Sequence, residues 1–123
     1  MKTFTLAEAN ALIPQLEQLV DDMRAVRAQL LAMGPSLESV VRAADGNGGS
    51  KKASAYVLLL QRFNAYTSTF QDWGCELKDL DLGLVDFPAY RDSQLVYLCW
   101  KRGEARIEYW HDLESGFGGR QPL

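Results

Sequence analysis

The chain has 123 residues, of which 47% are hydrophobic and 24% charged, and its formal net charge is −3. This length and composition are typical of one globular domain, and the scattered basic residues argue against nucleic acid or an anionic membrane as the main partner. Because no apolar run reaches the roughly 20 residues of a membrane span, and the N-terminus lacks the apolar stretch of a secretory signal, we expect a cytoplasmic protein.

The first predicted helix begins after Thr5, because Thr5-Leu-Ala-Glu8 fits a capping box. Pro14 interrupts the helical hydrogen bonds, so either one helix kinks there or a short helix ends and Pro14 lies in the first turn of a longer one. The kink is favoured because an apolar heptad register continues through this region. The register consists of Leu12, Leu16, Leu19, Met23, Val26, Leu30 and Met33.

A second helix is expected from about Ala53 to Trp73, with Gly74 as its C-terminal cap. The glycine-rich residues 45–50 before it predict a flexible tip. Two helices of similar length joined by a loop favour an antiparallel helical hairpin over about residues 5–73. The same heptad pattern would also suit a dimeric coiled coil.

Residues 84–111 read as three antiparallel strands with two-residue turns at Asp92-Ser93 and Arg102-Gly103. Period-two alternation then collects one face without any charge. Its members are Val85, Phe87, Ala89, Val96, Leu98, Trp100, Ala105, Ile107 and Tyr109. We expect this face to pack on the helical hairpin.

The other face of the predicted sheet is polar and aromatic. The expected register places Asp86, Cys99 and Arg106 in one row across it, where neighbouring side chains lie about 5 Å apart. It places His111 on the opposite face, which argues against a catalytic pair of Cys99 and His111. The two cysteines, Cys75 and Cys99, form neither a disulfide framework nor a metal-ligand spacing.

Together these elements predict an α+β fold with a single domain over residues 1–123. A long antiparallel helical hairpin packs against a small three-stranded antiparallel β-meander, which becomes four-stranded if Thr3-Phe4 adds an edge strand. A crossing segment and the meander occupy about residues 75–111. The tail, residues 112–123, has Phe117 as its single aromatic anchor, and the sequence leaves open whether it folds back over the sheet.

Two groups of residues are candidate sites. Aromatic and arginine side chains favour interfaces, which singles out Tyr90, Tyr97, Arg106 and Trp110 as an interaction face. Carboxylates with one histidine could hold Mg²⁺, Mn²⁺ or Fe²⁺, which singles out Asp79, Asp81, Asp86 and His111 as metal candidates. No motif identifies a catalytic residue or a cofactor.

The segments FTLAEANALIPQL and GCELKDLDLGLVDFPAYRDSQLVYLCWKRGEARIEYWHDLESGFGGRQPL resemble the bacterial family called domain of unknown function 2203. The resemblance is most specific in KDLDLGLVDFPA, YLCW and WHDLESGFGGRQPL. It implies no activity or cofactor, but it places any site in the sheet and the tail. The residues in these segments include Lys78, Asp79, Asp86, Cys99, Trp100, Trp110, His111, Gly116, Gly119 and Arg120.

The features of the sequence favour a non-enzymatic interaction or oligomerisation module that uses the heptad helices, the aromatic sheet face, or both. The partner would be a second copy or another protein. The alternative is a small-molecule or divalent-metal site built from the acidic residues and the histidine of the C-terminal half. It requires His111 and two carboxylates to converge within about 5 Å.

Overall fold

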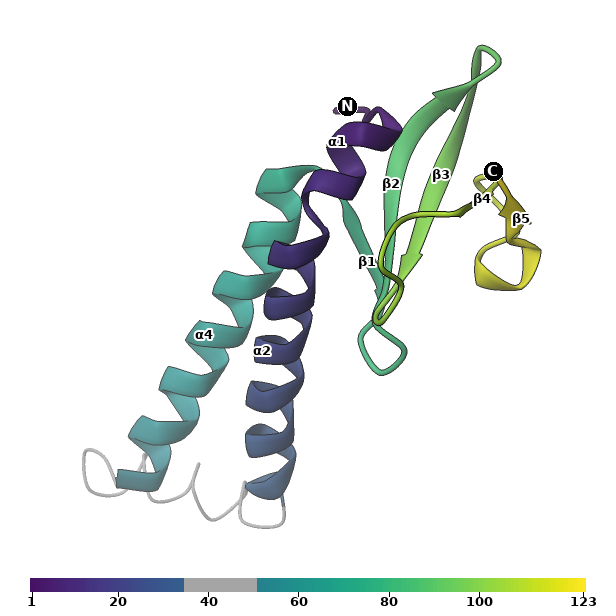
Figure 1. Ribbon diagram of the computed structural model, residues 1–123. Coiled ribbons are helices and arrows are strands. Elements are labelled where there is room, and N and C mark those ends of the chain that lie inside the picture. Colours follow the sequence, from purple (N-terminus) through teal and green to yellow (C-terminus); the bar gives the residue numbers. More distant parts are fainter. Residues whose placement is uncertain (35–50) are drawn as a thin grey trace.

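The computed structural model describes residues 1–34 and 51–123. In these residues the fold is α+β, with a helical layer against one face of an antiparallel sheet (Figure 1). The expected flexible tip at residues 45–50 lies outside the described residues. None of the described helices combines the length and the apolar character that a bilayer crossing requires.

The N-terminal helical region is two helices, α1 (Leu6–Ala11) and α2 (Ile13–Ala32). The Thr5 hydroxyl accepts from the Glu8 amide, and the Glu8 carboxylate accepts from the Thr5 amide, so the predicted capping box is confirmed. The expected kink in one continuous helix is wrong. Pro14 lies in the first turn of α2, where its missing N–H leaves no intrahelical bond unmade.

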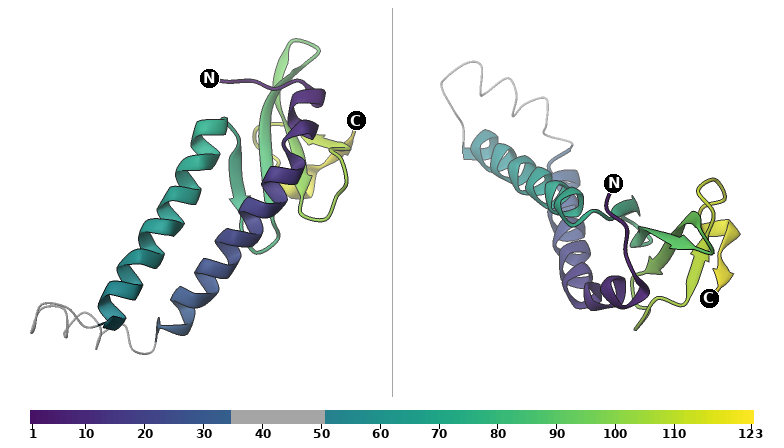
Figure 2. Two further views of the ribbon diagram at one scale, coloured as in Figure 1. Left: turned by 60° about the vertical axis from the view of Figure 1, so that its left-hand side comes forward. Right: turned by 90° about the horizontal axis from the view of Figure 1, so that it is seen from above.

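Helix α4 (Lys51–Trp73) runs antiparallel to α2 (Figures 1 and 2). Gly74 ends it with a φ of 88°, and the Gly74 amide donates to the carbonyls of Phe70 and Gln71. This left-handed conformation favours glycine, as the sequence indicates. Beyond Val26 no residue of α2 is buried, so this end of the helical pair extends past the sheet.

The sheet has five strands in the order β1-β2-β3-β4-β5. They are β1 (Glu76–Asp79), β2 (Leu84–Arg91), β3 (Gln94–Lys101), β4 (Tyr109–His111) and β5 (Gln121–Pro122). The expected three or four strands were too few. The crossing segment supplies β1 and the tail supplies β5, whereas Thr3-Phe4 contributes only a bond from the Phe4 amide to the Pro88 carbonyl.

The hydrophobic core lies between the helices and the apolar face of the sheet. Leu16, Val20 and Met23 of α2 pack with Phe87 and Trp100, all of them 1% exposed or less. Burying each of these side chains contributes roughly 1.5–3 kcal/mol. This core fixes the orientation of β2 and β3, and so directs the alternate residues of both strands to the opposite face.

Strand β4 is shorter than expected and its register differs from the prediction. Tyr97 pairs with His111 and Cys99 with Tyr109, so the expected row of Asp86, Cys99 and Arg106 is wrong. A shift by an odd number of residues exchanges the two faces of a strand. His111 therefore lies on the same face as Cys99, and Trp110 lies on the core side.

The physical reason for the shift is an irregular connection between β3 and β4. The Glu104 carboxylate accepts from the Lys101 amide at 2.6 Å, and the Glu104 carbonyl accepts from the Trp100 indole at 2.9 Å. The Ile107 amide then donates to the side chain of Asn10 in α1 at 2.7 Å. These bonds replace the ladder of a tight hairpin.

Candidate metal and ligand site

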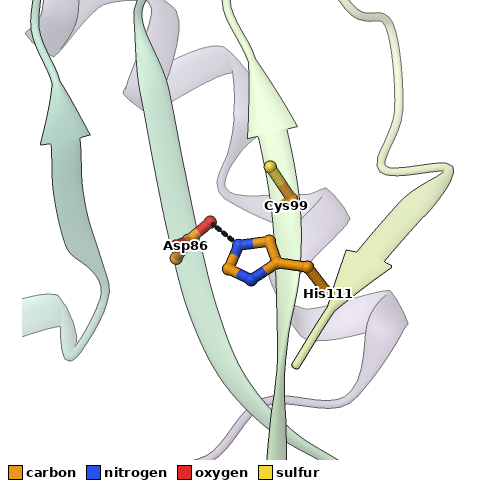
Figure 3. A group of neighbouring side chains, drawn as sticks. All are labelled: Asp86, Cys99 and His111. Carbon is orange, nitrogen blue, oxygen red and sulfur yellow. Dashed lines mark ion pairs between the residues drawn. The ribbon is translucent and has the colours of Figure 1, made fainter. Parts of the chain in front are cut away.

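Three strands bring Asp86, Cys99 and His111 together on the face of the sheet opposite the helices (Figure 3). One ligand atom of each residue lies within 4.8 Å of those of the other two. The three residues are 2%, 0% and 1% exposed. Burying a carboxylate, a thiol and an imidazole so completely is costly unless they are paired with each other or with a cation.

The orientation of the His111 ring follows from its two nitrogens. Nδ1 lies 2.6 Å from the carbonyl oxygen of Asp112, and a carbonyl can only accept, so Nδ1 carries a proton. In neutral imidazole the Nε2 atom then holds a lone pair. That lone pair points toward Asp86 Oδ1, 3.0 Å away.

Two acceptor atoms cannot face each other at 3.0 Å without a positive species between them. Nε2 is buried and, among the described residues, has no conventional hydrogen bond. One proton shared between Asp86 and His111 would satisfy both atoms, and so would a metal ion bound by both. Burial raises the pKa of Asp86, although the neighbouring imidazole opposes that shift, so this carboxyl holds a proton more readily than an exposed one.

Cys99 completes the group as a thiol. Burial, and then the negative charge of Asp86, raise the pKa of Cys99 to about 12. Without a cation the thiolate nucleophile is therefore scarce at neutral pH. A metal ion would reverse this effect, because a coordinated thiol loses its proton.

The three residues line a pocket of about 250 Å³. Lys78 and Tyr97 form part of its wall, and the Lys78 ammonium lies 4.9 Å from the centre of the Tyr97 ring. Apolar side chains and the tail provide the rest. The complete lining is Lys78, Leu84, Asp86, Tyr97, Cys99, His111, Leu113, Glu114, Gly116 and Phe117.

We call residues 112–120 the strap, because they fold back over this face of the sheet. The Asp112 carboxylate accepts from the amides of Glu114 and Ser115, and Gly116 turns the chain with a φ of 62°. Arg120 fastens the far end. Its guanidinium donates to the Cys99 carbonyl at 3.2 Å and to Glu104 at 2.6 Å, and it stacks on Tyr109.

The predicted metal candidates divide into two pairs. Asp86 and His111 converge, but Asp79 and Asp81 lie elsewhere, so only one of the two carboxylates that the hypothesis requires is present. Asp79 accepts from the Leu82 amide in a turn, and Asp81 is paired with Arg27 of α2. The expected second carboxylate is replaced by the Cys99 thiol.

The predicted interaction face is dispersed over the surface. Tyr97 lies in the pocket wall, and Trp110 packs partly against the core on the other side of the sheet. Tyr90 is 66% exposed near the β2–β3 turn, and Arg106 lies in the connection before β4. Tyr90 and Tyr97 share the predicted face of β2 and β3, whereas the shifted register of β4 places Trp110 on the other face, so the four side chains do not form one patch.

Sequence reasoning missed Cys99 as a partner of His111, although it placed Cys99 beside Asp86. The pairing of Cys99 with Asp86 could be predicted because β2 and β3 form a local hairpin whose register follows from its turn. The position of His111 could not be predicted, because the connection before β4 is held partly by a distant residue, through the bond from the Ile107 amide to Asn10 in α1. No local pattern in residues 102–108 carries that information.

A family model described as "Uncharacterized conserved protein (DUF2203)" matches residues 2–123. The match spans nearly the whole chain, including all three residues of the buried group and the strap. Comparison with curated proteins and with solved structures gave no significant match.

Proposed function

The chain belongs to the domain of unknown function 2203 family, whose description names no ligand or reaction, and from the buried group we propose that it binds a divalent transition-metal ion. Asp86, Cys99 and His111 would be the ligands, through one oxygen, one sulfur and one nitrogen atom. The observation that carries the proposal is the His111 ring, whose Nε2 lone pair is directed at the Asp86 carboxylate.

The surroundings of His111 also suit a metal ligand. Ligating histidines commonly donate their second ring nitrogen to a backbone carbonyl, which fixes the ring and its tautomer. The Asp112 carbonyl has this role here. The bond would hold the imidazole in place whether or not an ion is bound.

The set of donor atoms favours zinc. Zn²⁺ binds well to thiolate and imidazole ligands, whereas the hard cations Mg²⁺ and Ca²⁺ take oxygen ligands. Three protein ligands leave the fourth tetrahedral position for a small molecule or water. The adjoining pocket of about 250 Å³ would contain that fourth ligand, so the proposal includes a metal-assisted small-molecule site.

Titration of the purified protein with Co²⁺ tests the proposal, since cobalt reports its own coordination. We expect visible absorption of tetrahedral cobalt, a thiolate charge-transfer band, and displacement of both by Zn²⁺. Zinc at one hundred times its dissociation constant should stabilise the fold by about 2.7 kcal/mol. Cys99→Ser should abolish the charge-transfer band.

The matched control is Cys75→Ser, because Cys75 is the other buried thiol and lies in the core on the helical side. It should leave the cobalt spectrum unchanged. An unchanged melting temperature with Zn²⁺, Co²⁺, Fe²⁺, Ni²⁺ and Mn²⁺ would refute the proposal. So would equal effects of the two serine substitutions.

An interaction or oligomerisation role is the second candidate. It no longer draws support from the predicted aromatic face, whose members are dispersed. The exposed apolar residues of α4 support it instead.

We retain the proposal of a cytoplasmic protein without nucleic acid or membrane as a partner, which accords with its net charge of −3.

A further inference from the structure

Helix α4 has two dissimilar apolar faces. The inner face contacts the core through Phe63, Tyr66 and the buried Phe70. On the outer side Val57 and Leu58 are 49% and 62% exposed. They border a hollow of about 410 Å³ along the helix. All the other helices and strands of residues 1–34 and 51–123 lie on one side of α4, and none of them covers its outer side (Figures 1 and 2).

The outer face carries no charge over four turns. At 3.6 residues per turn, the positions opposite Phe63 and Phe70 between Lys51 and Asp72 are Ser54, Val57, Leu58, Gln61, Ala65 and Ser68. The solvent side of a surface helix is normally rich in charged residues. An uncharged face with two exposed aliphatic side chains is instead typical of a helix that packs against another helix.

We propose that this outer face is the interface of a homodimer, in which α4 packs antiparallel on α4 of a second copy. The two ends of the helix carry opposite charges, Lys51 at the start and Asp72 at the end. With Gln61 at the two-fold axis, Lys51 of each copy lies near Asp72 of the other. A parallel arrangement would place like charges together, so charge complementarity selects the antiparallel dimer.

The small residues of the face suit such a contact. Ser54, Ala65 and Ser68 would let the two helix backbones approach closely, while Leu58 of each copy packs near Ala65 of the other. Together with α2 of each copy, the paired α4 helices would form an antiparallel four-helix arrangement. This inference does not depend on metal binding, because the pocket lies on the far side of the sheet from the helices.

Light scattering after size exclusion, over a range of concentrations, tests the proposal on the full chain. We expect the mass of a dimer that dissociates on dilution. Leu58→Glu should shift the protein to monomer, because each copy would bury a carboxylate at the interface. Leu82→Glu is the control, since Leu82 is also an exposed leucine, 45% exposed, but lies in the β1–β2 turn.

Cysteine crosslinking tests the antiparallel register. Gln61→Cys should form an intermolecular disulfide under mild oxidation, because residue 61 faces itself across the axis. Ser54→Cys should not, because it faces Ser68 and lies about 21 Å from its own counterpart. The native cysteines are 3% and 0% exposed and do not compete.

A monomer at every concentration would overturn the proposal. This outcome includes the case in which the outer face binds a different protein and not a second copy. A dimer that survives Leu58→Glu would also overturn it. Crosslinking of Ser54→Cys in preference to Gln61→Cys would refute the antiparallel arrangement. A dimer lost in Leu58→Glu and kept in Leu82→Glu, with crosslinking at residue 61 alone, would establish it.

Discussion

At the scale of single residues, a backbone carbonyl decides which nitrogen of His111 faces the buried group. Because Nδ1 donates to Asp112, the other nitrogen must accept a proton or bind an ion. The Asp86–His111 contact in the metal-free protein is therefore best regarded as two acceptors that share one proton. This view gives different expectations for the two smallest changes at Asp86.

We expect Asp86→Asn to change the free energy of unfolding little and Asp86→Ala to lower it. The asparagine amide can donate an N–H to His111 Nε2, whereas alanine leaves that buried nitrogen without a partner. The cost of an unsatisfied buried polar atom is roughly 1–3 kcal/mol. Urea unfolding of the metal-free proteins measures the difference. Equal destabilisation by the two substitutions would show that the negative charge itself is required.

The second cysteine gives a prediction on pH. Burial raises the pKa of Cys75 from 9.0 to about 11, so the folded protein holds this proton more tightly than the unfolded chain does. The resulting contribution to stability is complete below pH 9 and is lost as the pH rises towards 11. Unfolding curves of wild type and Cys75→Ala should therefore converge between these values. A constant difference would contradict the shift.

At the scale of elements, the strap controls access to the pocket. It supplies Leu113, Glu114, Gly116 and Phe117 to the lining, and the Arg120 side chain bonds its far end to the Cys99 carbonyl and to Glu104. The Arg120 side chain is 13% exposed, so its bonds to the Cys99 carbonyl and to Glu104 are largely shielded from water. Hydrogen bonds of this charged kind are stronger than neutral ones.

We expect Arg120→Met to release the strap without unfolding the helices. The Cys99 thiol should then react with an alkylating reagent several-fold faster, while Cys75 should keep its wild-type rate. Mass spectrometry of the labelled peptides distinguishes the two thiols. Equal acceleration at both cysteines would mean that the whole domain has been destabilised and would contradict a local role.

The elements also explain which parts of the fold could be predicted. The capping box at Thr5, the glycine cap at Gly74 and the β2–β3 hairpin depend on residues close in sequence, and all three are confirmed. Strands β4 and β5 depend on distant partners, such as the bond between Ile107 and Asn10. Because the face of every β4 residue depends on that register, His111 was placed on the wrong face of the sheet, whereas Asp86 and Cys99 were placed correctly.

At the scale of the whole molecule, the sheet separates two chemically different halves. The helices cover its apolar face (Figure 1), and Asp86, Cys99 and His111 lie on the other (Figure 3), where the strap completes the pocket. The hydrophobic core therefore lies on one side of the sheet, and the buried group of Asp86, Cys99 and His111 lies on the other. Composition alone could not predict this division, but the alternation along β2 and β3 did.

This separation has a thermodynamic consequence. A ligand at Asp86, Cys99 and His111 and a second copy at α4 would contact opposite ends of the molecule, with the rigid core and sheet between them. Coupling between two sites needs a structural element whose equilibrium both sites influence, and the core and the sheet lie between α4 and the pocket. We therefore expect a coupling free energy near zero between zinc binding and dimerisation. Saturating zinc should leave the dimer dissociation constant unchanged. The protein would then have two independent binding sites, one for an ion and one for a second copy of itself.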